Sequence, residues 1–354
     1  MDLDEINDHL NDKEDESLLL KIREEGGLEK EDLIGKGKVE RKDGIWPLWI
    51  VGGIEYNVEP EPEPEHLEPE YDYSQDYLTI VPLENGTLKF TKYGTGDGIQ
   101  YSFDEGETWE TPYWPEIDIE VGSKVLCKAN LTPHVGSTDP GIGFFHSTAK
   151  FDVEGNTMSM LYGDDFKGKT DLIGEKWTLA YLFQQTGTGG VVNAENMVLP
   201  ATRLVNSCYT NMFMNCTTLT KAPKILPALE LADNCYGSMF SGCTSLTDAS
   251  KLPATNLIDN CYNYMFSGCT SLTKAPELPA LELAEWCYGG MFSGCTNLNY
   301  IKCLATDISK FRCIYNWVKN VSGEGTFIKN ASISVETWGE GISGIPSGWT
   351  VEDN

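Results

Sequence analysis

A segment of about 26 residues recurs four times in this chain, and this repeat limits the possible folds more than any other feature. Its best copy is "NCYGSMFSGCTSLT", and the Met-Phe pair of each copy follows the previous pair by 27, 26 and 26 residues. The same spacing reaches Leu182 upstream and Trp317 downstream, which gives six units between about residues 171 and 331. This period predicts a solenoid, whose terminal units differ from the others because each faces solvent. The four clear copies begin at Ser207, Asn234, Asn260 and Trp286.

Each unit divides into two parts with different patterns. Cys235, Tyr236, Met239, Phe240 and Cys243 stand at i, i+1, i+4, i+5 and i+8, a spacing that predicts one apolar face of a short helix. The following "TSLTKAPELPA" contains prolines that cannot continue a helix, so this part is expected to turn and run extended. One helix and one extended segment per unit predict the coil of a leucine-rich repeat.

The two cysteines of each unit are open to three interpretations, namely metal ligands, disulfides or packing. Eight helical residues separate the pair by about 12 Å, whereas a disulfide needs Cα atoms within about 7 Å. Equivalent cysteines in neighbouring coils are expected about 8–10 Å apart, which is also too far. No histidine recurs with the repeat, which disfavours a metal site. We therefore interpret the cysteines as buried structural thiols, in keeping with assembly in a reducing cytoplasm. They are Cys208, Cys216, Cys235, Cys243, Cys261, Cys269, Cys287 and Cys295.

A tyrosine follows the first cysteine of every clear copy. Tyrosine is a frequent contributor to binding interfaces because it buries a large area at a small cost in conformational entropy. The same ladder of rings is also consistent with packing between coils. Both interpretations stay open, and the candidate ligand surface consists of Tyr209, Tyr236, Tyr262 and Tyr288.

The N-terminal 75 residues differ in composition from the rest of the chain. They hold 23 Asp and Glu against 8 Lys and Arg, about half of the chain's formal net charge of -28. Residues 1–25 are expected to form an acidic amphipathic helix, and "GIWPLWIVGGI" needs a partner surface, either the following domain or another subunit. The segment "EPEPEPEHLEPE" predicts an extended, semi-rigid polyproline spacer. Candidate attachment residues are Leu3, Ile6, Leu10, Ile45, Trp46, Trp49 and Ile50.

Residues 76–170 read as a series of short strands about ten residues apart, which predicts an antiparallel β-sandwich. Within them "SFDEGETW" fits the Asp-box pattern, in which side chains fasten a hairpin turn and a Trp packs beneath it. We interpret this box as structural, because a sialidase also needs an arginine cluster and residues 76–170 contain no Arg. Its members are Ser102, Asp104, Gly106, Thr108 and Trp109.

Composition and motifs argue against several function classes. A chain this acidic is repelled by nucleic-acid phosphates, and no apolar run is long enough to span a bilayer. The acid pairs at Asp104 and Asp164 suit calcium or a glycosidase in principle, but solvated acidic loops are the simpler interpretation. The four histidines are scattered, and no nucleotide-binding or metalloprotease motif occurs. We therefore expect no enzyme activity, no cofactor and no metal.

The repeat carries a family resemblance. "CYxxMFxGCTSLTxAPxLPAxxLA" and the tail "GISGIPSGWTVED" resemble the BspA-like leucine-rich repeats of gut Bacteroidetes and their phages, over about half of the chain. The strand region resembles, more loosely, the β-domain that often precedes such repeats. Cellular members of this family are mostly surface proteins implicated in adhesion and carry a secretion or lipoprotein signal. The acidic start "MDLDEINDHL" lacks the features of such a signal, which favours a phage protein built in the host cytoplasm.

The sequence as a whole predicts a mixed, modular fold: an N-terminal helical or extended anchor, a β-sandwich domain and a C-terminal leucine-rich-repeat solenoid. The expected boundaries are 1–57 for attachment, 58–75 for the linker, 76–170 for the sandwich and 171–354 for the solenoid. The expected function is that of a phage virion structural protein, a head fibre or capsid decoration. Its N-terminus would bind capsid or other virion proteins, and its repeats a host-surface protein or glycan. The alternative is a bacterial cell-surface adhesin whose signal has been removed. A trimer would suit a fibre, although no sustained heptad supports one.

Overall fold

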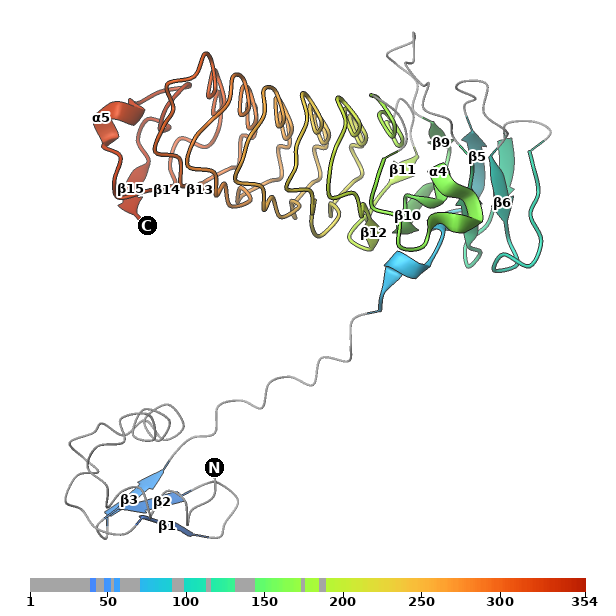
Figure 1. Ribbon diagram of the computed structural model, residues 1–354, viewed down its shortest axis with the longest axis horizontal. Coiled ribbons are helices and arrows are strands. Elements are labelled where there is room, and N and C mark those ends of the chain that lie inside the picture. Colours follow the sequence, from blue (N-terminus) through green and yellow to red (C-terminus); the bar gives the residue numbers. More distant parts are fainter. Residues whose placement is uncertain are drawn as a thin grey trace. The chain divides into compact units, whose positions relative to one another are not determined.

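The computed structural model describes residues 39–42, 48–51, 54–57, 71–90, 99–112, 116–130, 144–172, 176–184 and 189–354 (Figure 1). The chain forms two compact units, Met1–Tyr71 and Asp72–Asn354. The first unit contains a three-stranded antiparallel sheet in the order β1-β2-β3. Its strands are β1 (Val39–Lys42), β2 (Leu48–Val51) and β3 (Ile54–Asn57).

The prediction of a helical or extended anchor is wrong for the described part of the first unit, because that part is a sheet. Trp49 in β2 stands opposite Arg41 in β1 and Tyr56 in β3, and Ile50 stands opposite Glu40 and Glu55. The alternation of branched, aromatic and charged residues in these short strands suits pairing in a sheet. The helix expected over residues 1–25 lies outside the described residues, as do Leu3, Ile6, Leu10, Ile45 and Trp46.

The second unit begins with two sheets that enclose an apolar core. One sheet has the order β11-β10-β4-β8-β6, with β12 also paired to β10, and the other has the order β7-β5-β9. Its elements are η1 (Tyr73–Gln75), β4 (Leu78–Pro82), β5 (Gly86–Phe90), β6 (Gln100–Ser102), β7 (Glu116–Ile119), β8 (Val125–Lys128), β9 (Phe145–Ser147), β10 (Lys150–Asn156), α4 (Ser159–Tyr162), η2 (Gly163–Phe166), β11 (Gly190–Val191) and β12 (Met197–Val198).

The strand region and the repeats share one continuous core. In the six-stranded sheet the antiparallel strands end at β10. The strands β11 and β12 then pair with β10 in parallel. The rings of Phe145, Phe183 and Phe213 stack in succession at centroid distances of 5.2 Å and 5.3 Å. The aromatic packing therefore passes from the sheets into the repeats without a break.

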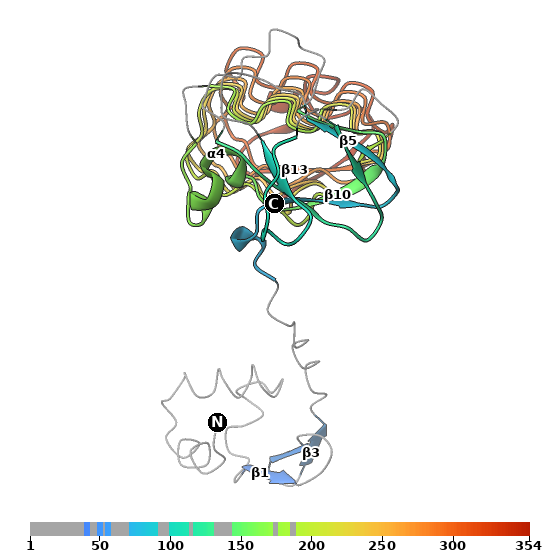
Figure 2. The same ribbon diagram turned by 90° about the vertical axis from the view of Figure 1, so that its right-hand side faces the viewer.

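The repeats form parallel coils placed side by side (Figures 1 and 2). Their aromatic rings stack in register. The ring of Phe240 stacks on Phe213 and on Phe266, at 5.4 Å in each case. At the C-terminal end a parallel sheet, β13-β14-β15, covers the last coil together with the short helix α5 (Val335–Trp338). Its strands are β13 (Tyr300–Cys303), β14 (Thr326–Lys329) and β15 (Thr350–Asp353).

The helix that we predict in every unit is absent from the four clear copies. The backbone instead turns to positive φ at every fourth residue, with values of 54° at Asn234, 52° at Ser238 and 78° at Gly242. Between these residues the hydrogen bonds alternate in direction. Met239 N–H bonds to Tyr236 O within the same coil, at 3.2 Å, and Phe240 N–H bonds to Met265 O in the next coil, at 2.9 Å. The segment is thus a run of four-residue turns joined to its neighbours like a strand.

The predicted fold class is therefore wrong. The described residues are mostly β, with α4 and α5 as the only α-helices among them, and they do not form a helical anchor followed by a leucine-rich-repeat solenoid. The physical reason lies in the period: apolar pairs exactly four residues apart drift around a helix of 3.6 residues per turn, but stay on one side of four-residue turns. Gly and Asn, which tolerate positive φ, occupy many of the turn positions.

Candidate functional site

The Asp box is fully used in holding its own turn. Asp104 accepts hydrogen bonds from Thr108 N–H at 2.9 Å and from the hydroxyls of Thr108 and Ser102, at 2.5 Å and 2.7 Å. The bonds from Thr108 are the main cause that lowers the pKa of Asp104 to about 2. Gly106 takes a φ of 90°, and its Cα faces the ring of Trp109. The box brings its five members together in one turn.

The acidic pair at Asp164 is likewise engaged. Its carboxylate accepts the Tyr77 hydroxyl at 2.8 Å and pairs with Lys128 Nζ at 2.7 Å. Burial and this carboxylate raise the pKa of Tyr77 to about 12. Lys128 also lies 4.0 Å from the ring centroid of Trp109, so the group joins the Asp box to the sheet. In the described part of the chain, no three His, Cys, Asp or Glu side chains gather as metal ligands.

All eleven cysteines are free and buried. The second cysteine of each unit donates its thiol to the carbonyl of the Phe in the preceding coil, for example Cys243 to Phe213 O at 3.0 Å and Cys269 to Phe240 O at 3.2 Å. The sequence offers no direct sign of this bond between coils. Burial raises the pKa of the Cys303 thiol to about 12 and that of Cys243 well above its usual range.

This burial predicts the reactivity of the thiols. We expect a thiol reagent such as DTNB at pH 8 to modify almost none of the cysteines in the native chain, because the reactive thiolate is inaccessible and disfavoured. After unfolding in guanidinium, all 11 should react. Mass spectrometry after each treatment gives the count. Rapid modification of two or more cysteines in the native state would contradict this packing.

The four ladder tyrosines are core residues, so the prediction that they form a ligand surface is wrong. Tyr209, Tyr236, Tyr262 and Tyr288 are buried. Their rings stack on one another at centroid distances of 5.6 Å, 5.7 Å and 6.2 Å along the coils. A planar ring repeated at the spacing of the coils gains more from continuous stacking than from exposure to solvent.

The candidate binding site lies where the hydrogen bonds between two coils are interrupted. At the junction before this one, on the extended side of the coils, Ala222 N–H bonds to Asp248 O at 2.9 Å. At the junction after it, Ala275 N–H bonds to Tyr300 O at 2.9 Å. No backbone hydrogen bond joins residues 247–257 to residues 273–283, although both segments are fully described. We call this interrupted junction the seam.

The seam is bounded at both ends by intact contacts. Ser271 N–H bonds to Thr244 O at 3.2 Å on one side, and Glu285 N–H bonds to the Asp259 carboxylate at 3.0 Å on the other. On the turn side of the same two coils the ladder is complete, as in the bond from Tyr236 N–H to Cys261 O at 3.0 Å. The coils are therefore held together at one side and open at the other.

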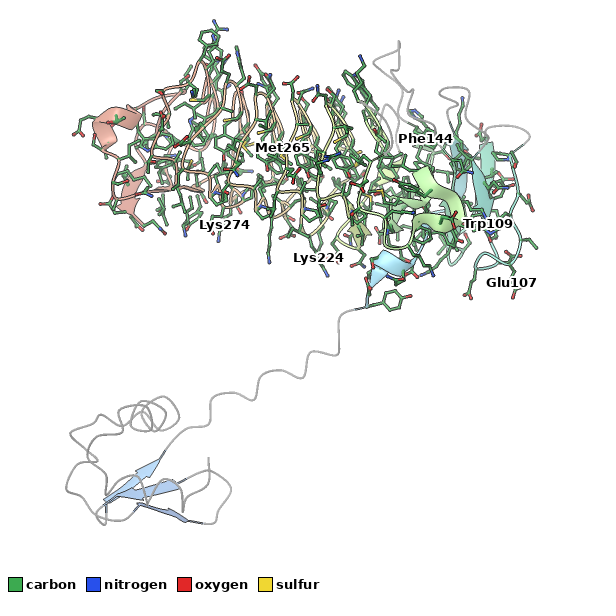
Figure 3. The ribbon with its side chains drawn as sticks, viewed as in Figure 1. Glu107, Trp109, Phe144, Lys224, Met265 and Lys274 are labelled. Atoms are coloured by element: carbon green, nitrogen blue, oxygen red, sulfur yellow. The ribbon has the colours of Figure 1, made fainter. Side chains whose placement is uncertain are left out.

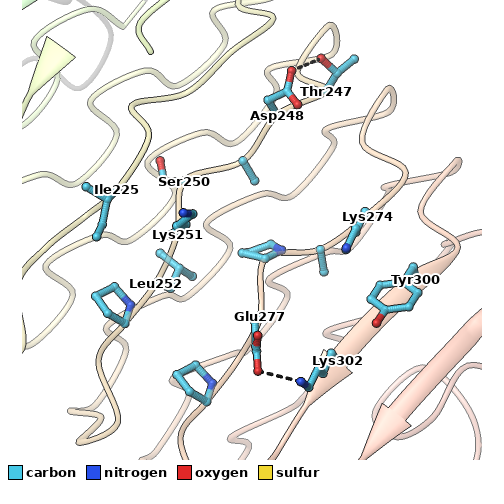
Figure 4. Close-up of a pocket in the computed structure, with 15 residues that line it drawn as sticks. Ile225, Thr247, Asp248, Ser250, Lys251, Leu252, Lys274, Glu277, Tyr300 and Lys302 are labelled. Atoms are coloured by element: carbon cyan, nitrogen blue, oxygen red, sulfur yellow. Dashed lines mark hydrogen bonds and ion pairs between the residues drawn. The ribbon is translucent and has the colours of Figure 1, made fainter. Parts of the chain in front are cut away.

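A groove of about 780 Å³ lies along the seam (Figure 4). Three lysines line it, Lys251, Lys274 and Lys302, against the two acids Asp248 and Glu277. Apolar side chains complete the lining, among them Ile225, Leu252, Pro253, Pro276, Pro279 and Tyr300. Figure 3 places Lys224 and Lys274 along the same edge of the coils, while Met265 lies inside them. A groove with more cations than anions stands out in a chain of net charge -28.

Some polar side chains that line the groove have ion-pair or hydrogen-bond partners, and others have none among the described residues. Lys302 pairs with Glu277 at 3.0 Å, and Lys274 Nζ lies 4.9 Å from the ring centroid of Tyr300. Lys251 and Lys274 form no ion pair with a carboxylate of the described residues. The Ser250 hydroxyl is fully buried and has no hydrogen-bond partner in the described structure. A ligand in the groove would supply the partner that buried hydroxyls normally have. The hydroxyls of Tyr209 and Tyr236 in the core lack a partner in the described part of the chain as well.

The groove is not among the features predicted from the sequence, although the sequence contains a signal for it. The coil at the seam reads "TDASKLPA", where its neighbours read "TKAPKILPA" and "TKAPELPA". Asp248 thus replaces a lysine and Ser250 replaces a proline.

No protein-family model, curated protein or solved structure matches the chain. None of the helices in the described segments has the length and apolar character needed to cross a bilayer.

Proposed function

We propose that this chain is a non-enzymatic structural protein of a phage virion, a head fibre or capsid decoration that displays its repeats for binding. In this proposal residues 1–57 attach to the particle, and the residues from 58 up to the start of the second unit at Asp72 act as a spacer. The coils of the second unit then present a binding surface to a host-cell or mucosal ligand. The resemblance of the repeat motif to proteins implicated in adhesion supports a binding role.

The observation that carries the proposal is the groove along the seam, on coils whose interior is packed by stacked rings. Continuous stacking of Tyr236 on Tyr262 and of Phe240 on Phe266 favours a rigid support. The polar groups of Asp104 and Asp164, the best candidates for chemistry, are engaged in structural hydrogen bonds. A rigid support that carries an open groove suits binding better than catalysis.

A bacterial cell-surface adhesin remains the second candidate. The observation that favours it is the repeat motif itself, since cellular proteins with similar repeats are mostly found at the cell surface. The two candidates share the binding role of the coils and differ in what the N-terminal unit contacts.

The N-terminal unit provides the test between them. Phage particles stripped of the protein should take up the full chain during co-sedimentation, whereas a chain that begins at Asp72 should stay in the supernatant. Circular dichroism and thermal unfolding of the shorter chain serve as the folding control. Equal sedimentation of both chains, or of neither, would argue against attachment through residues 1–57.

A further inference from the structure

We propose that the groove along the seam binds an extended acidic peptide segment of a partner protein, whose backbone bonds to the unpaired groups of the interrupted ladder. This inference rests on the proposed binding role of the coils and names the class of ligand. Three observations carry it: backbone groups without the bonds that their neighbours make, lysines without acidic partners, and a buried hydroxyl without a partner.

The backbone groups specify an extended peptide. At the adjoining junctions, Leu226 N–H bonds to Lys251 O at 3.1 Å and Leu278 N–H bonds to Lys302 O at 3.0 Å. The equivalent donor at the seam is Leu252 N–H, and its expected acceptor, Glu277 O, is not bonded to it. Peptide groups spaced along an extended segment match such donors and acceptors, which is the basis of recognition by strand addition. A sugar chain does not repeat donors and acceptors with this spacing.

The charges specify an acidic ligand. Lys251 and Lys274 lie on opposite sides of the seam, and both line the groove. In a bound strand, alternate side chains point to the same face, so carboxylates two residues apart can approach both lysines. The Ser250 hydroxyl, buried beside them, can bond to the peptide backbone. Apolar residues such as Leu252 and Tyr300 give the rest of the ligand a surface to cover.

The probe for this inference is a fluorescein-labelled, acetylated dodecapeptide of alternating Glu and Thr, followed by fluorescence anisotropy with the full chain. We expect saturable binding that weakens as NaCl rises from about 0.05 to 0.3 M, because salt screens the exposed charges. Lys251→Glu and Lys274→Glu should each weaken binding by about fivefold or more. The charge-matched control is Lys319→Glu, which lies outside the groove and should leave binding unchanged.

Ser250→Pro tests the backbone contribution with little risk to folding. The neighbouring coils already have proline at this place, at Pro223 and Pro276, each preceded by alanine as Ser250 is. The variant removes both the buried hydroxyl and one N–H, and we expect at least about threefold weaker binding, as for the loss of one hydrogen bond. Its thermal unfolding should remain close to that of the parent chain.

Amide hydrogen exchange separates strand addition from simple charge attraction. In the free chain, Ala249 and Leu252 N–H should exchange faster than Ala222 and Leu278 N–H, which are bonded. The peptide should slow exchange at Ala249 and Leu252 and leave the other two unchanged. Oligogalacturonate, a carboxylate-bearing sugar chain, serves as the competing ligand and should not slow these amides.

Three outcomes would overturn the inference: no peptide binding, binding that ignores both lysine variants, or stronger binding of oligogalacturonate at the same groove. None of these outcomes decides the proposed function, which the sedimentation experiment tests separately. A chain that assembles into particles yet ignores the peptide refutes the strand-addition proposal alone. A chain that binds the peptide but is absent from particles refutes only the virion role.

Discussion

Replacing Phe266 with alanine should lower the free energy of unfolding of the second unit by about 3–5 kcal/mol, in the range of Phe-to-Ala substitutions in protein cores. Phe266 is fully buried, and its ring stacks on Phe240 at 5.4 Å and on Phe292 at 5.9 Å. The substitution leaves a cavity in the middle of the aromatic ladder. Rigid turns on both sides limit how far the neighbouring coils can relax into that cavity.

Guanidinium unfolding of the full chain, followed by tyrosine and tryptophan fluorescence, gives this value. Phe311→Ala is the matched control, because Phe311 is 58% exposed and its substitution should cost less than about 1 kcal/mol. Similar losses for the two variants would contradict a stack held together by its buried aromatic ladder. Retention of the parent stability by Phe266→Ala would contradict it equally.

A second large effect is expected at Gly155, where an added methyl group has no space. Gly155 in β10 has a φ of 84°, and a Cβ there would lie 2.0 Å from the carbonyl oxygen of Tyr77. Gly155→Ala therefore combines left-handed strain with a backbone clash. We expect a loss of about 3–5 kcal/mol, or failure to fold, because the clash forces β10 away from the segment before β4.

Gly168→Ala separates the effect of left-handed strain from that of the backbone clash. Gly168 has a φ of 72°, but no atom lies within 4 Å of its hypothetical Cβ. We expect this variant to lose only about 1–2 kcal/mol, the cost of left-handed strain alone. Thermal unfolding of both variants, with soluble yield as the second readout, makes the comparison. Equal losses would show that steric contact with Tyr77 does not matter.

The repeat shows which features of the fold can be predicted from the sequence. The spacing of Met239 and Met265 is enough to predict the register of the repeats, because ladders of identical residues require it, and Phe240 does stack on Phe266. The local conformation is not predictable in the same way, since an apolar pattern with a period of four resembles a helix over nine residues. Asn234, Ser238 and Gly242 hold the missing signal, because four-residue spacing of Asn, Ser and Gly marks recurrent turns.

The candidate site was less predictable than the fold. Burial of the cysteines follows from their chemistry, and the tyrosines were ambiguous because the same ladder suits a surface or a core. The groove depends on hydrogen bonds that are missing at one junction, and no property of a single residue predicts a missing bond. In the sequence, that coil differs from its neighbours at this place by having both Asp248 and Ser250 where they have Lys and Pro.

The central claim, that this is a virion protein that displays its repeats, is tested most directly by mass spectrometry of purified phage particles. The account predicts peptides from both units in the particle, including the stretch from Val39 to Asn57, at a constant ratio to the major capsid protein. Recovery of the chain only from bacterial outer-membrane fractions, with none in purified particles, would contradict it and favour the adhesin.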